Sequence, residues 1–332
     1  MPNGRVEIHA FESKVLAGNA AGDPHVRRIP VWLPPSYDGS PARRYPVVFV
    51  LTGFTGRGRA LLNDAPWSLP LDERLDRLVA NGCGELIVVM PDCFTRFGGS
   101  QYINSTATGR YGDHLVDELV PWADATFRTR AERDHRGVAG KSSGGFGAMT
   151  LGLTRPDVFG AVACHSGDMC FDYCYRVDVP GTCSILQEAG GTKAFLERFE
   201  AKPQKSKADF TALNVLAMAA CYSPDPAAEL GVALPFDFAT GAFRDDVWAR
   251  WLAFDPLLRM PACEPALHSL HLLYLDVGTR DEFHLHHGAR QFVHELQARG
   301  IAHTYEEFDD GHMNVSYRYD RSIPLLAQAL GA

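Results

Sequence analysis

Residues 136–153 read RGVAGKSSGGFGAMTLGL, and the expected fold class follows from them. A short apolar strand, Arg136 to Ala139, runs into Gly140-Lys141-Ser142-Ser143-Gly144-Gly145, and a helix-forming segment follows at once. A sharp strand-to-helix turn brings backbone segments too close for a Cβ, which explains glycines on both sides of Ser142. The pattern is typical of a nucleophile elbow, in which the turn lifts a serine hydroxyl over the edge of a sheet.

This stretch has two other possible interpretations. Gly140-Lys141-Ser142 resembles the end of a phosphate-binding loop, but that motif needs a glycine five residues before Gly140, where the chain has His135. A nucleotide site is therefore disfavoured. The other alternative is a glycine-rich turn without chemistry, which does not account for the further residues described below.

The segments around the elbow predict a doubly wound α/β sheet. Short continuous apolar runs are typical of strands that helices bury on both faces. They lie at 46–51, 86–90, 137–139, 160–164 and 270–277, with a last strand at 304–308. Helix-period segments alternate with them at 71–80, 114–127, 143–153 and 287–298. Two more strands, 5–11 and 25–33, surround a turn-rich segment and predict an antiparallel start. The whole chain, residues 1–332, is thus expected to form one domain.

One interval interrupts this alternation. Residues 168–265 are too many for a simple crossover between strands, and they contain helix-like pieces at 193–200 and 210–220. We expect an insertion that forms a lid over the site, and a purely structural excursion is the alternative. The aromatic residues Phe236, Phe238, Trp248 and Trp251 within it are equally compatible with a small core and with a substrate platform.

A serine nucleophile predicts two more residues, an acid and a histidine, downstream of it. His312 lies in the loop after the last strand and has no apolar face around it that would make it a core residue. Asp281 lies in the loop after the strand that ends near Val277, and we expect it to be the acid. Glu282 and Asp276 stay open as alternatives for that role.

A tetrahedral intermediate also needs donors for its oxyanion. These are normally the amide after the nucleophile and one amide from the loop after an earlier strand. The corresponding residues are Ser143 and Phe54, the latter in Leu51-Thr52-Gly53-Phe54, where Gly53 allows the backbone to turn. A simple tight turn is the alternative for this segment.

These motifs together resemble the esterase branch of the α/β-hydrolase superfamily that contains S-formylglutathione hydrolases, feruloyl esterases, enterochelin-type esterases and mycolyltransferases. The resemblance covers most of the chain and implies the α/β-hydrolase fold. It also implies a triad of Ser142, Asp281 and His312, with the amides of Phe54 and Ser143 as oxyanion hole. Thr52, where many relatives have His, and Lys141, where His, Gln or Leu is common, depart from the family pattern.

The expected function is that of a serine esterase that hydrolyses a small or aromatic carboxylic ester through an acyl-enzyme, with no cofactor. An acyltransferase with the same triad is the first alternative, because a lid that excludes water can favour another alcohol as acceptor. A non-catalytic binding protein on a hydrolase fold is the second, since a fold does not guarantee a function.

Composition limits the partners. The 332 residues are 46% hydrophobic and 22% charged, with a net charge of -8, so a surface that binds nucleic acid through its phosphates is disfavoured. No uninterrupted apolar run is long enough to span a bilayer, and residues 1–16 carry charges where a signal peptide would be apolar. The cytoplasm is the expected compartment, and a homo-oligomer remains open.

A histidine cluster, a further single histidine and a cysteine cluster have weaker claims to function. His284, His286 and His287 follow the expected acid, but no accompanying pattern supports a metal site, and the rim of the pocket or a helix start is favoured. His165 ends a strand and is expected to be structural rather than to face the site. Of the eight cysteines, Cys170, Cys174 and Cys183 lie close in sequence, so a disulfide in the insertion is the alternative to buried thiols.

Overall fold

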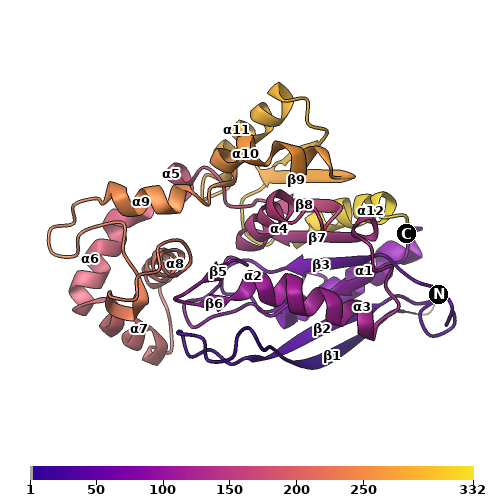
Figure 1. The fold of residues 1–332 in the computed structure, drawn as a ribbon, viewed down its shortest axis with the longest axis horizontal. Coiled ribbons are helices and arrows are strands. Elements are labelled where there is room, and N and C mark those ends of the chain that lie inside the picture. The colour runs from indigo at the N-terminus through magenta and orange to yellow at the C-terminus, as the bar shows by residue number, and fades with distance from the viewer. Residues whose placement is uncertain (1–2) are drawn as a thin grey trace.

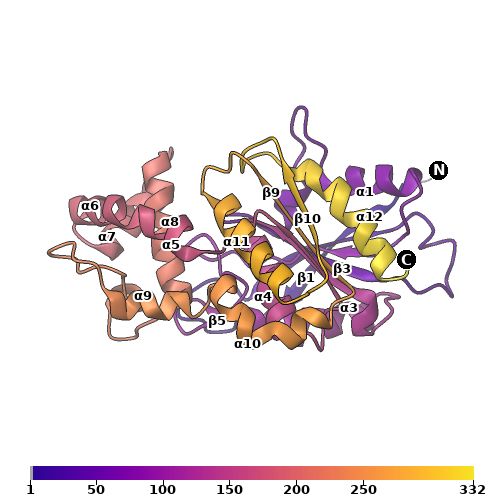
Figure 2. The same ribbon diagram turned by 90° about the horizontal axis from the view of Figure 1, so that it is seen from above.

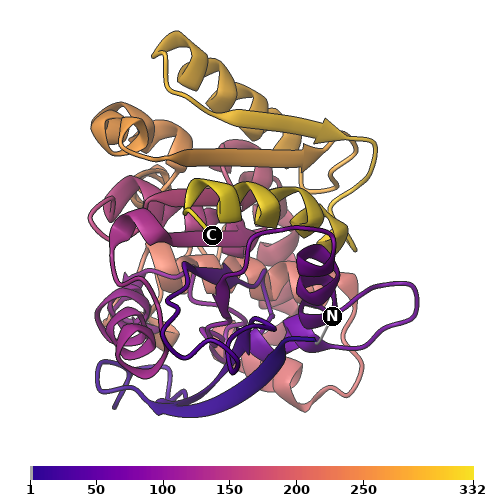
Figure 3. The ribbon, with the colours of Figure 1, turned by 90° about the vertical axis from the view of Figure 1, so that its right-hand side faces the viewer.

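The computed structural model describes residues 3–332 as an α/β fold around one large sheet (Figure 1). The strands of this sheet are β1 (Arg5–Glu12), β2 (Val26–Leu33), β3 (Val47–Leu51), β4 (Ile87–Val89), β7 (Arg136–Lys141), β8 (Ala161–His165), β9 (Leu272–Gly278) and β10 (Thr304–Phe308). Their order is β1-β2-β4-β3-β7-β8-β9-β10, and in Figure 3 this order runs from bottom to top. A separate short pair consists of β5 (Asn104–Ser105) and β6 (Gly109–Arg110).

Only the start of the sheet is antiparallel. β1 pairs with β2 and β2 pairs with β4 in antiparallel register, whereas all the remaining neighbours are parallel. β3, β4 and β8 are buried along their whole length, which agrees with the continuous apolar runs in their sequences. The predicted fold class is therefore confirmed, including the antiparallel N-terminal strands.

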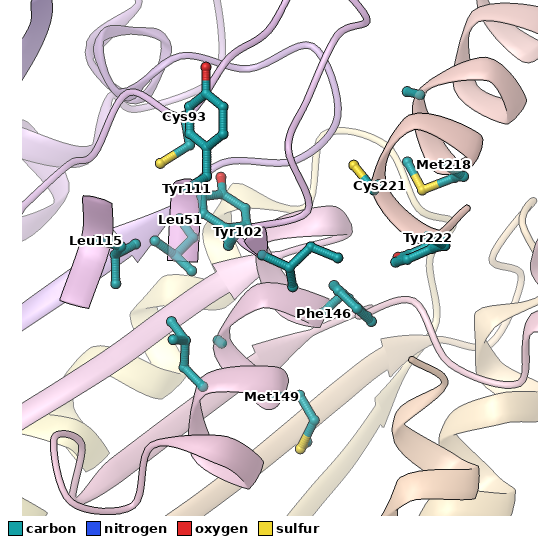
Figure 4. Packing of buried hydrophobic residues seen from close by; sticks show 14 of the residues in the cluster. Leu51, Cys93, Tyr102, Tyr111, Leu115, Phe146, Met149, Met218, Cys221 and Tyr222 are labelled. Atoms are coloured by element: carbon teal, nitrogen blue, oxygen red, sulfur yellow. The ribbon is translucent and has the colours of Figure 1, made fainter. Parts of the chain in front are cut away.

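Alternation of side chains along the strands supplies two hydrophobic layers. Val48 and Val50 face one layer with α1 (Leu71–Ala80) and α12 (Tyr319–Ala329). Phe49 and Leu51 face the other layer, which includes α3 (Val120–Thr126) and α4 (Ser143–Thr154). Figure 2 shows these helices on opposite sides of the strands, and Figure 4 shows part of the second layer.

The expected helix at 114–127 is not one regular α-helix. A short α2 (Tyr111–Asp113) leads into a π-helical turn, His114–Leu119, before α3 begins. Pro121 lies in the first turn of α3 and cannot donate a backbone hydrogen bond to the preceding turn. A wider helical turn in front of it accommodates that loss.

The segment between β8 and β9 is helical. It contains α5 (Phe171–Cys174), α6 (Val179–Ala189), α7 (Thr192–Ala201), α8 (Lys207–Tyr222), α9 (Asp245–Leu252) and α10 (Pro256–His268), before α11 (Leu285–Ala298) follows β9. α10 packs against α4 and so belongs to a layer on the sheet. α6 to α9 form a lobe beside the sheet, to the left in Figure 1. The buried side chains of this lobe continue the hydrophobic layer that contains α4.

Charged side chains link the last strand, β10, to α12 and to the turn directly before that helix. Arg321 and Arg318 both form ion pairs with Glu306 on β10, with Arg321 Nη2 2.8 Å from a carboxylate oxygen. These two guanidinium groups lower the pKa of Glu306 to about 2, well under its ordinary value of 4.5. Because the pKa is depressed in the folded state, the interaction stabilises the fold above about pH 4.5 and is lost as the pH falls toward 2.

We therefore expect E306Q to lower the free energy of unfolding at neutral pH, and to do so less at acidic pH. Urea denaturation of the wild type and the variant between pH 7 and pH 3.5 measures this difference. It should be largest above pH 4.5 and shrink below it. A difference that stays constant over the whole range contradicts the stabilising role of the ionised carboxylate.

Candidate active site

Ser142 lies at a sharp turn between β7 and α4. Its backbone has φ 60° and ψ -126°, a conformation that is rare for a residue with a side chain. A Cβ on Gly140 would lie 2.2 Å from the Gly144 oxygen, and a Cβ on Gly144 would lie 2.3 Å from the Leu51 oxygen. Both positions thus require glycine, and the serine side chain remains only half-buried.

The turn after β3 approaches this elbow closely. A Cβ on Gly53 would lie 3.3 Å from both the Lys141 oxygen and the Ser142 Cβ. Within residues 3–332, the backbone amides of Phe54 and Ser143 have no hydrogen-bond acceptor. Two free amides beside a serine side chain are the arrangement that an oxyanion requires.

Parallel pairing of β9 and β10 brings together the loops that carry Asp281 and His312. The strand ends are in register at Gly278 and Phe308, and a Cβ on Gly278 would lie 2.4 Å from the Asp310 oxygen. His312 Nδ1 lies 2.8 Å from Asp281 Oδ2, and both side chains are buried. Asp281 Oδ1 also accepts a hydrogen bond from the Phe283 amide at 2.9 Å, which fixes the carboxylate.

The two alternative acids have different partners. Glu282 Oε2 accepts a hydrogen bond from the backbone amide of His312 at 2.6 Å, so it supports the loop rather than the imidazole. Asp276 lies on the same face of β9 as Tyr274, in the layer of α1 and α12. It accepts hydrogen bonds from His165 Nδ1 and Arg318 Nε, each at 2.8 Å.

His165 is a structural histidine in this arrangement. Its Nδ1 donates to Asp276, and its Nε2 lies 2.8 Å from Ser322 Oγ on α12. Both ring nitrogens therefore have partners inside the protein, and the side chain is buried. This agrees with the interpretation that the sequence favoured.

Lys141, directly before the serine, is a partly buried charged residue at the elbow. Burial lowers the pKa of its ammonium group, while the charges of Asp281, Asp168 and Glu282 partly oppose this shift. Within residues 3–332 its ammonium group has no carboxylate within 4.0 Å. Its charge partly balances the three carboxylates that surround the elbow.

The remaining clusters are placed as follows. The ring centroids of His286 and His287 lie 4.0 Å apart at the start of α11, with the ring planes tilted by 42°, and His284 precedes that helix. No group of three metal-ligating side chains occurs in the part of the chain that the structure describes. All eight cysteines are described and none is in a disulfide. No helix within residues 3–332 combines the length and apolar character needed to cross a membrane.

The aromatic residues of the insertion belong mainly to its core. Phe236, Trp248 and Trp251 are buried, and Trp251 Nε1 donates a hydrogen bond to Ser223 Oγ at 2.8 Å. Phe238 is the exception, with 40% of its surface exposed. A core therefore accounts for three of the four without any substrate.

Some residues next to the elbow carry no signal in the sequence. Gln101 and Tyr102 both have positive φ, 50° and 57°, although neither is glycine. Gln101 Nε2 lies 3.1 Å from Asp168 Oδ2, and the Asp168 carboxylate lies near Ser143. A polar residue in a loop between strands is ordinary, so only the folded chain brings these groups to the site.

Comparison with known proteins identifies a family for this chain. The model of the family described as "Putative esterase" matches residues 24–320. The chain belongs to this esterase family. An esterase of Mycobacterium tuberculosis is 39% identical over 83 residues, which cover 25% of this chain and 18% of that protein. An endo-1,4-beta-xylanase/feruloyl esterase of Xylanibacter ruminicola is 32% identical over 130 residues, covering 37% and 17%. The chain thus spans less than a fifth of the length of these two relatives.

Solved structures of other proteins share the fold over nearly the whole chain. A ferulic acid esterase superposes with a TM-score of 0.63 at 19% identity, covering 99% of this chain and 100% of the other. An S-formylglutathione hydrolase from Agrobacterium tumefaciens gives a TM-score of 0.58 at 17% identity, covering 100% and 97%. At this identity the similarity shows the α/β-hydrolase fold alone.

The steric constraint at the elbow can be tested with two glycines. We expect G144A to unfold the protein or to lower its thermal midpoint strongly, because the new methyl group meets the backbone oxygen of Leu51 rather than a movable side chain. G181A, in α6, is the matched control, since nothing lies within 4 Å of its Cβ position. It should stabilise the protein by about 0.5–1 kcal/mol. Thermal unfolding followed by circular dichroism measures both, and equal effects contradict the constraint.

Proposed function

We propose that this protein is a serine carboxylic-ester hydrolase whose triad is Ser142, His312 and Asp281. The observation that carries the proposal is the buried His312–Asp281 hydrogen bond of 2.8 Å. The two residues lie in the loops after β9 and β10, at the same end of the parallel strands as the elbow after β7. The free amides of Phe54 and Ser143 supply the oxyanion hole in this proposal. Membership of the esterase family supports the same chemistry.

Each group has one task in the first half of the reaction. Ser142 Oγ attacks the ester carbonyl carbon while His312 Nε2 takes the hydroxyl proton, and the carbonyl π electrons move onto the oxygen. The amides of Phe54 and Ser143 donate hydrogen bonds to this oxyanion. Asp281 accepts a hydrogen bond from the Nδ1–H group of His312, so that the imidazole keeps the correct tautomer and its protonated form is stabilised.

Collapse of the intermediate breaks the bond to the alcohol, which leaves with the proton that His312 returns. An acyl-enzyme on Ser142 remains. A water molecule then attacks the acyl carbon while His312 takes its proton, and a second tetrahedral intermediate releases the carboxylic acid and the free serine. All proton transfers involve protein side chains and water, so this scheme needs no cofactor.

Exposed apolar side chains favour a small or aromatic ester as substrate. The ring of Phe283 stands edge-on to His312 with 4.8 Å between centroids, and Met313 follows His312 directly; they are 43% and 58% exposed. Trp67 is fully exposed in the loop after β3, and the neighbouring Ser68 Oγ lies 3.4 Å from Ser316 Oγ. Apolar surface around the histidine favours an uncharged acyl or alcohol group.

The triad is tested by substitution. We expect S142A and H312A each to lose about a millionfold in kcat, and D281N about ten-thousandfold, because the three groups act as a unit. Hydrolysis of p-nitrophenyl acetate measures these losses. Mass spectrometry after treatment with a fluorophosphonate should show one adduct on the wild type and none on S142A.

E282Q and D276N are the controls for the acid. E282Q should lower kcat far less than D281N, because its carboxamide oxygen can still accept a hydrogen bond from the backbone amide of His312. D276N should mainly lower stability, since it disturbs buried partners in the other layer. The acid is misassigned if E282Q or D276N proves as damaging to kcat as D281N.

The apolar rim predicts a preference among esters. F283A and M313A should raise KM for naphthyl or phenyl esters about two- to tenfold, because an aromatic contact contributes about 0.5–1.5 kcal/mol, and change KM for a methyl ester little. I8A is the control, as Ile8 is also exposed but lies on β1, at the opposite edge of the sheet from β10. If the ratio of KM for the aromatic ester to KM for the methyl ester is the same in both rim variants as in the wild type, this surface is not the substrate contact.

A further inference from the structure

A buried carboxylate behind the elbow is held by neutral donors and forms no ion pair within residues 3–332, although the charges of Lys141 and His312 act on it from a longer distance. Asp168 follows β8, and its side chain forms no ion pair within the described residues. Its partners are all neutral donors: Tyr175 OH at 2.7 Å, Gln101 Nε2 at 3.1 Å and Ser143 Oγ at 3.4 Å. All three converge on one oxygen, Oδ2, so a single atom joins three parts of the chain.

Such a group is costly to the fold. Burial raises the pKa of Asp168, while the hydroxyl of Tyr175 and the amide of Gln101 act in the opposite direction by donating to the charged form. Apolar packing of the same volume is often at least as stabilising as a buried charged cluster. Stability is therefore a poor explanation for Asp168, and its contact with Ser143 suggests a task at the elbow.

The first branch of the cluster reaches one proposed oxyanion donor. Ser143 is the first residue of α4, and its side chain bonds to Asp168 while its own backbone amide is free. The hydrogen bond restricts the rotation of this residue and so helps to fix the direction of its amide. A displacement of about 1 Å in such a group can cost a hundredfold in rate.

The second branch reaches the other donor. Gln101 is followed by Tyr102, whose hydroxyl donates to the Thr52 carbonyl oxygen at 2.6 Å, two residues before Phe54. Gly98, in the same loop, lies against the Phe54 ring, because a Cβ there would be 2.7 Å from its carbons. The positive φ of Gln101 and Tyr102 is strained for residues with side chains, and their buried contacts hold them there.

The third branch leaves the sheet and enters the helical lobe. Tyr175 lies just after α5, and its ring packs 6.0 Å from that of Trp251 on α9. Tyr222, at the end of α8, has its hydroxyl 2.9 Å from Gln101 Nε2. The ring of Tyr222 packs edge-on to that of Phe146 on α4 with 5.8 Å between centroids, and Figure 4 shows these two side chains near each other. Hydrogen bonds and aromatic packing thus join the lobe to the base of the elbow.

We infer that Asp168 is a positioning residue: its carboxylate holds Ser143 and Gln101, and through them the amides of Ser143 and Phe54, in a fixed relation to the helical lobe. This inference rests on the proposed esterase function. It assigns the lobe a role in aligning the oxyanion hole, separate from any contact between the lobe and the substrate.

The test compares D168N with D255N. Asp255 is a matched control because its carboxylate is also buried, with a raised pKa due to burial, but it accepts hydrogen bonds from the backbone amides of Cys170, Phe171 and Leu257. We expect both variants to lower the thermal midpoint. Only D168N should lower kcat of the folded enzyme, by about 10- to 100-fold, with KM changed less than about threefold.

Y175F and S143A keep the test valid if D168N does not fold. Each removes one hydroxyl from Asp168, and each should lower kcat and the rate of phosphonylation by a fluorophosphonate by about three- to tenfold. Tyr175 and Ser143 are linked through Asp168, so the loss from Y175F should largely disappear in the S143A background. If the losses in kcat of Y175F and S143A simply multiply in the double variant, the proposed link through Asp168 is overturned.

The two hypotheses fail in different ways. A wild-type protein that neither hydrolyses esters nor reacts with the fluorophosphonate overturns the proposed function, and this inference with it. An active wild type whose D168N variant matches D255N in kcat, or changes only in KM, overturns the positioning role alone. An active wild type with a selective loss of kcat in D168N supports both.

Discussion

Contact between backbones at the elbow is the constraint on which the rest of the site depends. Gly144 packs against the last residue of β3, and Gly140 packs against Gly144, at distances that leave no room for a Cβ. Because β3 and β7 are adjacent parallel strands, the turn after β7 and the turn after β3 lie against each other. The Ser142 side chain and the free amides of Phe54 and Ser143 lie where these two turns meet as a consequence.

The proposed site also depends on the separation of two carboxylates, one on β9 and one in the loop after it. Asp276 points into the layer of α1 and α12, where His165 and Arg318 bind it. Asp281 lies beyond the end of the strand and binds His312. The alternation of side chains along a strand and the end of that strand thus separate a structural carboxylate from the one that we propose as catalytic.

The helical lobe connects to the site through its base. The buried side chains of α8 and α9 continue the hydrophobic layer under α4, and the hydroxyls of Tyr175 and Tyr222 reach Gln101. The aromatic residues that the sequence left open as a substrate platform are, apart from Phe238, core residues of this lobe. A lobe joined to the elbow by these contacts is suited to supporting it, whereas its action as a lid stays a prediction.

The sequence by itself determined the sheet, the elbow and the proposed reacting residues. Continuous apolar strands, glycines around Ser142 and polar loops after strands are local patterns, and each has a local physical cause in burial, steric contact or chain reversal. Only the tertiary structure decided the partners of three neighbouring carboxylates, Asp276, Asp281 and Glu282, because hydrogen bonds between distant segments distinguish them. The roles of Gln101 and Asp168 also emerge only from the tertiary structure, since the positive φ of Gln101 and the burial of the Asp168 carboxylate result from packing and leave no pattern along the chain.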